Sequence, residues 1–266
     1  MVGTILERII ETKLDEVAEA KRRRPVEALK RDIAPMADPR DFFSAVVTGG
    51  SDVHLIAEVK KASPSAGLIR PDFDPVSIAR DYEEAGASAL SVLTDRTYFQ
   101  GDLAFISRIK DVVSLPVLRK DFIVDEYQVH ESRAAGADAI LLIAAVLSPV
   151  QIGAWIELSF NLGMASLVEV HDVRELGLVR DLIGSRRRAL LGINNRDLRV
   201  QQVDLQNTHR LAGELAAGTP FVAESGIRTR DDVLLLRRSG ATALLVGETL
   251  MSADDPGAKL RELLGR

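Results

Sequence analysis

The sequence predicts an α/β fold, a TIM (β/α)8 barrel preceded by an N-terminal helical extension. Eight short apolar stretches of strand length recur along the chain, and amphipathic segments of helix length separate most of them. The ends of successive stretches lie 23 to 34 residues apart, about the length that a crossover between parallel strands needs. Eight such steps without a long structureless gap fit a closed parallel barrel better than an open sheet.

Length and composition agree with a single barrel domain over residues 1–266. Of the 266 residues, 46% are hydrophobic and only 5% are aromatic, so the core must consist mainly of aliphatic side chains. Such cores are typical of layered α/β packing, and α/β barrels of about 200 to 250 residues form one domain.

The N-terminal extension covers residues 1–50 and begins with a predicted amphipathic helix. Its apolar residues form one stripe at helical spacing, made of Ile5, Leu6, Ile9, Ile10, Leu14 and Val17. Pro25, Pro35 and Pro39 interrupt the helical pattern that follows.

The predicted strands are rich in β-branched residues, leucine and alanine, as buried parallel strands are. They cover residues 53–60, 88–94, 116–120, 138–143, 165–170, 189–194, 220–225 and 242–247. Clear amphipathic helices follow the first, third and seventh, at 74–86, 124–136 and 229–240. Three of the helix ends read Ala-Gly or Ser-Gly and lead at once into the next strand, which indicates a repeated βα unit.

Composition and charge exclude several classes of function. The net charge of −5 and the pI near 5.5 do not favour nucleic acid, whose phosphates require a basic surface. The chain has no cysteine, which excludes disulfides and thiolate chemistry and fits a reducing cytoplasm. It has no apolar stretch of membrane-spanning length, so we expect a cytoplasmic protein without membrane partners.

Polar residues gather where the predicted strands end, which is where βα barrels carry their functional side chains. These residues are Glu58, Lys60, Lys120, Glu169, Asn194, Arg196, Glu224, Ser225 and Gly247. Because side chains alternate along a strand, Glu58 and Lys60 point toward the barrel axis if Val59 packs outward. The alternative is an internal ion pair that only fills the barrel.

Lys120 ends the third strand among these carboxylates. A buried or half-buried lysine suits general-acid catalysis or Schiff-base formation. The alternative is a structural salt bridge with Asp121, but strand alternation sends Asp121 to the opposite face.

Glu169 ends the fifth strand and adds a second carboxylate for proton transfer. His171 lies two residues further on and raises the possibility of a metal site. The histidines are scattered without the spacing of a metal motif, so we expect no metal; they are His54, His130, His171 and His209.

Small residues after the seventh and eighth strands predict a phosphate site. Gly226 and Gly247 let backbone N–H groups approach a ligand, and each leads toward a helix N-terminus. With Lys60, Lys120 and Arg196 nearby, the ligand should carry a phosphate and perhaps a second anion. Proton transfer without a metal or redox cofactor is the implied chemistry.

Eight motifs in order resemble the indole-3-glycerol phosphate synthase family. They are IAEVKKASPSAG (56–67), LTDRTYFQGD (93–102), LRKDFIVDEYQV (118–129), GADAILLIAAVL (136–147), LVEVHD (167–172), GINNRDL (192–198), VAESGI (222–227) and VGETLM (246–251). The resemblance runs from about residue 4 to the C-terminus. It implies closure of the indole ring of 1-(2-carboxyphenylamino)-1-deoxyribulose 5-phosphate, with release of carbon dioxide and water, in tryptophan biosynthesis.

The resemblance also implies roles for individual residues. Lys120 is the general acid that protonates the ketone oxygen, and Glu169 is a base or a stabiliser of the cationic intermediate. Glu58 and Lys60 serve the later proton transfer and dehydration. How the steps divide between the two lysines and the two glutamates stays open at this point.

The substrate-binding residues implied by the resemblance fall into three groups. The polar centre of the substrate is held by Asn194, Arg196 and Glu224, and Asn194 also counts among the catalytic residues. The phosphate end of the substrate is bound by Ser63, Ser225, Gly226 and Gly247, and Glu248 is a further substrate-binding residue. Apolar walls come from Phe99, Phe122, Pro64, Ile143 and Leu198, and residues 1–50 cap the barrel mouth. The chain departs from the family pattern at Ile5 and Ser252, which affects affinity more than reaction type.

Two other functions stay open from the sequence. One is a Schiff-base aldolase that acts on a sugar phosphate through Lys120, and the other is a phosphate-binding barrel without catalysis. In every case the expected partner is a small phosphorylated molecule, and we expect a monomer.

Overall fold

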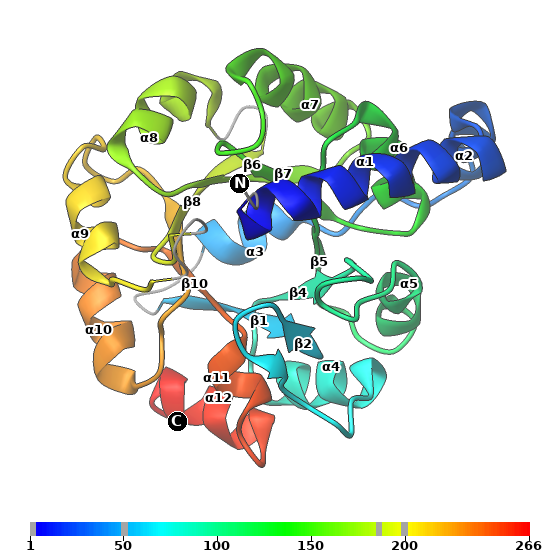
Figure 1. The fold of residues 1–266 in the computed structure, drawn as a ribbon. Coiled ribbons are helices and arrows are strands. Elements are labelled where there is room, and N and C mark those ends of the chain that lie inside the picture. The colour runs from blue at the N-terminus through cyan, green and yellow to red at the C-terminus, as the bar shows by residue number, and fades with distance from the viewer. Residues whose placement is uncertain (1–3, 49–52, 185–187, 198–201) are drawn as a thin grey trace.

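Eight parallel strands close into a barrel within the residues that the structure, a computed structural model, describes: 4–48, 53–184, 188–197 and 202–266 (Figure 1). The strands are β1 (His54–Val59), β4 (Ala89–Leu93), β5 (Val117–Lys120), β6 (Ala139–Ile143), β7 (Ala165–Val170), β8 (Ala189–Asn194), β9 (Phe221–Glu224) and β10 (Ala243–Val246). Their order around the barrel is β1-β10-β9-β8-β7-β6-β5-β4, and β4 pairs with β1 to close it. The predicted (β/α)8 barrel is confirmed, and each predicted strand agrees with the structure to within one residue at either end.

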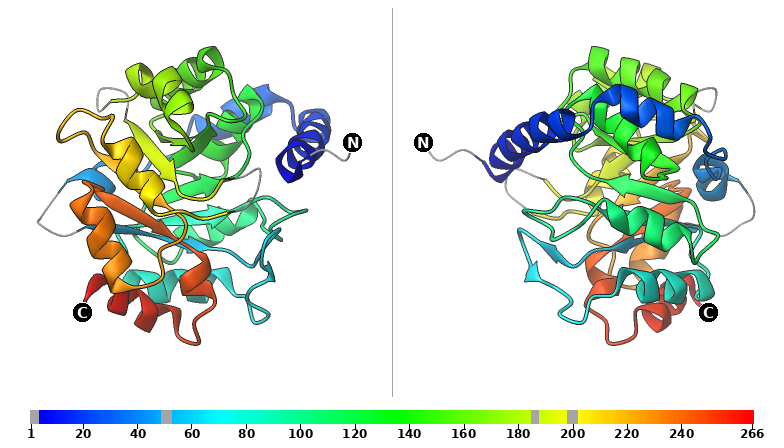
Figure 2. Two further views of the ribbon diagram at one scale, coloured as in Figure 1. Left: turned by 60° about the vertical axis from the view of Figure 1, so that its left-hand side comes forward. Right: turned by 90° about the vertical axis from the view of Figure 1, so that its right-hand side faces the viewer.

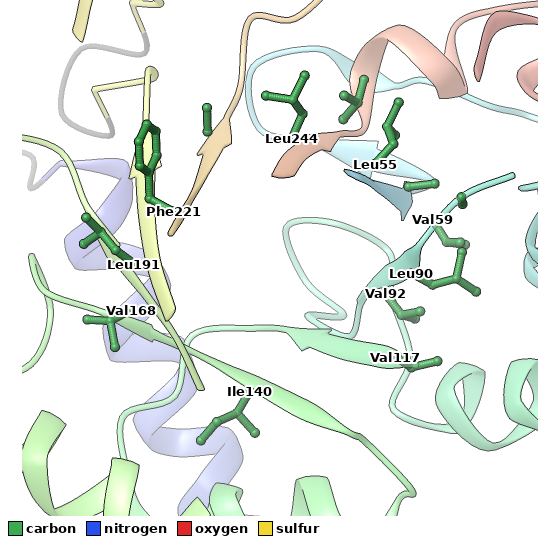
Figure 3. Packing of buried hydrophobic residues seen from close by; sticks show 14 of the residues in the cluster. Leu55, Val59, Leu90, Val92, Val117, Ile140, Val168, Leu191, Phe221 and Leu244 are labelled. Carbon is green, nitrogen blue, oxygen red and sulfur yellow. The ribbon is translucent and has the colours of Figure 1, made fainter. Parts of the chain in front are cut away.

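Alternation along the strands divides the apolar core into an inner and an outer layer. The inner layer fills the barrel with side chains that include Ile56, Leu118, Leu141, Leu167, Leu190, Val222 and Leu245. The outer layer packs against the surrounding helices, and Figure 3 shows its strand residues, among them Leu55, Val59, Leu90, Val168 and Leu244. Val59 therefore faces outward, as the predicted inward orientation of Glu58 and Lys60 requires.

The helices that follow the strands form the outer ring. They are α4 (Pro75–Glu84), α5 (Ala104–Lys110), α6 (Glu126–Ala134), α7 (Pro149–Asn161), α8 (Val173–Val179), α9 (Gln206–Ala212), α10 (Arg230–Arg238), α11 (Glu248–Met251) and α12 (Pro256–Leu264), with a 3-10 turn at Arg180–Leu182. Side-chain caps begin most of them; Asp125 and Gln128, for example, form a capping box at α6. Gly136 follows the end of α6 with φ of 91°, which lets the chain turn directly into β6.

The N-terminal extension contains three helices that lie in different places. They are α1 (Ile5–Arg23), α2 (Val26–Ile33) and α3 (Phe42–Val47). Figure 2 shows α1 and α3 at opposite ends of the barrel, while α2 packs on α6 at its side. Only α1 borders the end at which the strands finish. That residues 1–266 form a single domain stays a prediction.

The loop after β1 carries a short hairpin that the sequence did not predict. Its strands are β2 (Ala62–Ser63) and β3 (Gly67–Leu68), each of two residues. Such short strands leave no periodic pattern to detect. Separately, no helix in the described ranges is long and apolar enough to cross a membrane.

Candidate active site

A cavity opens where the barrel strands end. It encloses about 1210 Å³ between protein atoms, part of which is open to solvent. All the predicted site residues that the structure describes line it: Glu58, Lys60, Ser63, Pro64, Phe99, Lys120, Phe122, Ile143, Glu169, Asn194, Arg196, Glu224, Ser225, Gly226, Gly247 and Glu248. Leu198 lies outside the described residues. The barrel therefore brings together residues that are as far apart in the sequence as β1 and β10.

Lys120 lies between two buried carboxyl groups. Its Nζ is 3.2 Å from Oε2 of Glu169 and 3.8 Å from Oε2 of Glu224. Burial by itself would lower the pKa of Lys120, but the neighbouring acids, Glu169 first among them, more than offset this, and the pKa lies above that of an ordinary lysine. Asp121 pairs with another cation, with Oδ2 3.0 Å from Nη2 of Arg119. Lys120 is thus an ammonium group aimed into the cavity.

The two carboxyl groups beside Lys120 differ in charge. Burial disfavours both carboxylates, but in Glu169 the cation of Lys120 and the contact with His171 outweigh it and hold the pKa well below its usual range. In Glu224, burial and the neighbouring charge of Glu169 raise the pKa to about 8. At neutral pH Glu169 is a carboxylate, whereas Glu224 is protonated and can donate a hydrogen bond. Two carboxyl groups with separated pKa values are typical of proton-transfer sites.

Glu58 and Lys60 form a second ion pair in the cavity wall, with 2.7 Å between Oε1 and Nζ. Ser91 donates a hydrogen bond to Oε2 of Glu58 at 3.4 Å. Gly247 leaves room for this pair, because a Cβ atom there would overlap the carboxylate of Glu58 and meet Nζ of Lys60 at 3.0 Å. The absence of a side chain at Gly247 thus preserves the ion pair.

Arg196 brings a further cation to the rim. Its Nη2 donates to Oε2 of Glu248 at 3.1 Å, and its backbone N–H donates to Oδ1 of Asn194 at 2.9 Å. Asn207 on α9 donates to the backbone carbonyl of Asn194 at 3.0 Å and fixes the end of β8. Arg196 and Asn194 therefore act as one rigid polar corner of the cavity.

The predicted phosphate site lies between the ends of β9 and β10. Ser225 and Gly226 adopt positive φ values of 68° and 83°, which turn the backbone sharply after β9. Gly247 is the N-cap of α11, as predicted, and α10 begins at Arg230. Gly226 leads to α10 through the short loop at residues 227–229, and the N-cap of α10 is Thr229, where the predicted helix 229–240 begins.

Apolar side chains form the remaining walls. The rings of Phe99 and Phe122 lie 6.1 Å apart between centroids and are tilted by 40°. Sequence reasoning missed Leu6 and Ile9 of α1 and Arg228 after β9, all of which line the cavity. The apolar stripe of α1 was visible in the sequence, and the resemblance implied that this extension caps the barrel mouth, but neither singled out Leu6 and Ile9 as site residues.

His171 contacts the protein's own acids. Its Nε2 is 3.2 Å from Oε1 of Glu169, and its Nδ1 is 3.1 Å from Oε2 of Glu175. Within the described ranges, no group of three or more His, Asp or Glu residues is arranged to hold a metal ion.

Comparisons with known proteins agree with one another. The family model described as indole-3-glycerol phosphate synthase matches residues 6–263. Indole-3-glycerol phosphate synthase of Polaromonas sp. is 47% identical over 99% of this chain and 99% of its own length. Indole-3-glycerol phosphate synthase of Chlorobaculum tepidum is 47% identical over 95% of this chain and 97% of its own length. That of Chromobacterium violaceum is 48% identical over 98% of this chain and 98% of its own length.

Solved structures with low sequence identity share the fold alone. A 3-hexulose-6-phosphate synthase superposes with a TM-score of 0.63 at 16% identity, covering 80% of this chain and 99% of its own. A mutant tryptophan synthase alpha-subunit from Pyrococcus furiosus gives a TM-score of 0.58 at 14% identity, covering 81% of this chain and 99% of its own.

Proposed function

The chain belongs to the indole-3-glycerol phosphate synthase family, and on that premise we propose how its cavity carries out the family's reaction. The protein is a carboxy-lyase of tryptophan biosynthesis. It converts 1-(2-carboxyphenylamino)-1-deoxyribulose 5-phosphate to indole-3-glycerol phosphate. The assignment of individual residues to the steps is the proposal.

Lys120 is the general acid of ring closure. As the aromatic carbon attacks the ketone carbon, the carbonyl π bond breaks and its oxygen takes a proton from Nζ of Lys120. The observation that carries this role is the ammonium group held 3.2 Å from Glu169 inside the cavity. A Schiff-base aldolase would instead need a neutral lysine, and the raised pKa of Lys120 opposes that form.

The other charged groups serve the later steps. After ring closure the C–CO2 bond breaks and carbon dioxide leaves, and then the new hydroxyl group leaves as water. Glu169, as a carboxylate, stabilises the cationic intermediate or takes the proton that is lost. Of Glu58 and Lys60, which are paired at 2.7 Å, one can donate the proton with which the hydroxyl leaves as water, and the other can accept the proton that the ring system loses. Protonated Glu224 and the corner formed by Asn194 and Arg196 hold the polar centre of the substrate.

The apolar walls fold the flexible substrate so that the reacting carbons meet. Phe99, Phe122, Pro64 and Ile143 enclose it from the barrel side, and α1 covers it through Ile5. Orientation of this kind contributes several kcal/mol in general. We further propose that the enzyme works in the cytoplasm as a monomer without a metal or cofactor, and the absence of cysteine supports the compartment.

Direct assay tests this function. The purified protein, mixed with the carboxyphenylamino-deoxyribulose phosphate in the presence of a chelator, is expected to produce indole fluorescence. Borohydride added during turnover should leave the mass of the protein unchanged. Absence of indole fluorescence would contradict the synthase function. A reduced covalent adduct on Lys120 would contradict its role as a general acid.

Ser225→Asp is expected to raise KM about tenfold or more while kcat changes less. The new carboxylate would stand against the substrate phosphate and repel it, and a tenfold loss of affinity corresponds to roughly 1.4 kcal/mol. Ser225→Asn is the matched control, because asparagine has the same shape, tolerates the positive φ of this position and carries no charge. Equal KM values for the two variants would show that the substrate phosphate does not bind beside Ser225.

A further inference from the structure

We propose that His171 is a positioning residue, which holds Glu169 in the orientation and charge state that ring closure needs. The proposal deepens the function proposed above and rests on it for the role of Glu169. His171 is not among the described residues that line the cavity, so it acts on the reaction through Glu169.

The carboxylate of Glu169 lies between two cationic groups, one at each oxygen. Its Oε2 accepts a hydrogen bond from Nζ of Lys120 at 3.2 Å, and its Oε1 is 3.2 Å from Nε2 of His171, an ion-pair contact without hydrogen-bond geometry. The side chain of Glu169 is 1% exposed and that of His171 is 8% exposed, so solvent competes little with either contact. The carboxylate cannot rotate without losing one of its two partners.

The imidazole ring is itself held from the opposite side. Its Nδ1 is 3.1 Å from Oε2 of Glu175, which also accepts the backbone N–H of His171 at 2.7 Å. Asp172 fixes Glu175 by accepting its backbone N–H at 2.8 Å at the start of α8. Asn207 of α9 donates to the backbone carbonyl of His171 at 3.0 Å. Two helices therefore fix the ring that orients the carboxylate.

Contacts at both ring nitrogens favour an imidazolium ion. A neutral imidazole has one N–H, so it could donate to only one of its two carboxylates. Burial by itself would lower the pKa of His171, but the contacts with Glu169 and Glu175 outweigh it and raise the pKa to about 10. The charged groups that contact the ring are Glu169 of β7 and Glu175 of α8. Beyond them, Lys120 of β5 contacts Glu169 and Glu224 of β9, Asp172 accepts from Glu175, and Arg210 of α9 bonds to Asn207.

The positive charge at His171 bears on how protons divide between Glu169 and Glu224. Both carboxyl groups are buried beside Lys120, and each disfavours ionisation of the other. Of these two carboxyl groups, His171 contacts Glu169 and acts on Glu224 only as a lesser coulombic attraction, so it favours the carboxylate at Glu169. Without His171 the pKa of Glu169 would rise, and its carboxylate form would be lost at a higher pH.

His171→Gln is expected to move the acidic limb of the kcat/KM profile upward by roughly one pH unit. Glutamine keeps a hydrogen-bond donor but removes the positive charge. On the plateau kcat should fall about tenfold, with KM within about twofold, because the residue orients a catalytic group and does not touch the substrate. His209→Gln is the matched control on the exposed face of α9, and it should leave the profile unchanged.

Histidine NMR tests the charge state independently of turnover. In the full-length protein labelled with 15N-histidine, one ring should stay protonated at both nitrogens and titrate with a midpoint of about 10. That signal should be missing in His171→Gln. A His171 ring that titrates as an ordinary histidine overturns the proposal, even if the protein proves to be an active synthase. If the wild-type protein is inactive, the proposed function is contradicted, but the histidine NMR titration still measures the charge of His171.

Glu175→Gln gives a second test if His171→Gln does not fold. It preserves an acceptor for the backbone N–H of His171 but removes the charge that helps to hold the imidazolium. A smaller upward shift of the same limb supports the proposal. Loss of stability or a uniform loss of kcat, with the limb unmoved in the folded variant, shows a merely structural role and overturns it.

Discussion

Lys120→Met is expected to lower kcat by about 10³-fold while the barrel stays folded. Removal of a general acid typically costs 10² to 10⁴-fold, and here it also removes the cation between Glu169 and Glu224. Methionine keeps the length and the apolar stem of lysine. Glu169 can take up a proton once its partner is lost, so the free energy of unfolding should change far less than the rate.

Indole fluorescence under saturating substrate measures the loss, and far-UV circular dichroism checks the fold. Lys259→Met is the matched control, because Lys259 lies in a surface ion pair with Glu262 on α12. It should leave kcat unchanged. Turnover of Lys120→Met at near the normal rate would show that another group protonates the ketone.

Lys13→Met is expected to lower the free energy of unfolding by about 3 kcal/mol, because it breaks a buried ion cluster. Nζ of Lys13, on α1, is 2.9 Å from Asp95 and 3.1 Å from Asp121. Asp95 accepts the backbone N–H of Phe99 at 3.2 Å, and Asp121 accepts that of Phe122 at 2.8 Å. Loss of Lys13 should therefore also loosen the two aromatic walls and raise KM several-fold.

Urea unfolding measures the stability change, and Lys21→Met on the same helix is the control. Lys21 pairs with Asp125 at 2.6 Å, but this lysine is 46% exposed, and such pairs contribute less than about 1 kcal/mol. Equal losses for both variants would mean that burial of the Lys13 cluster has no special effect. An unchanged KM in Lys13→Met would show that this ion cluster does not hold the aromatic walls of the cavity in place.

Much of the site could be predicted because a parallel barrel has only one functional end. Once the strands were placed by their apolar runs, alternation fixed which side chains face the axis, and Glu58, Lys60 and Lys120 followed directly. The loop residues were harder to place. The hairpin of β2 and β3 after β1 was missed, because strands of two residues carry no periodic signal.

By itself, the sequence determined the strands, their parallel order and the rim on which the polar residues gather. These depend on local apolar patterns and on alternation, which act over a few residues. Only the tertiary structure decided which charges meet: Lys13 with Asp95 and Asp121, and Glu169 with both Lys120 and His171. Such pairs form across strands and between a helix and the barrel, and their distances and burial set the pKa differences from which the proposed chemistry follows.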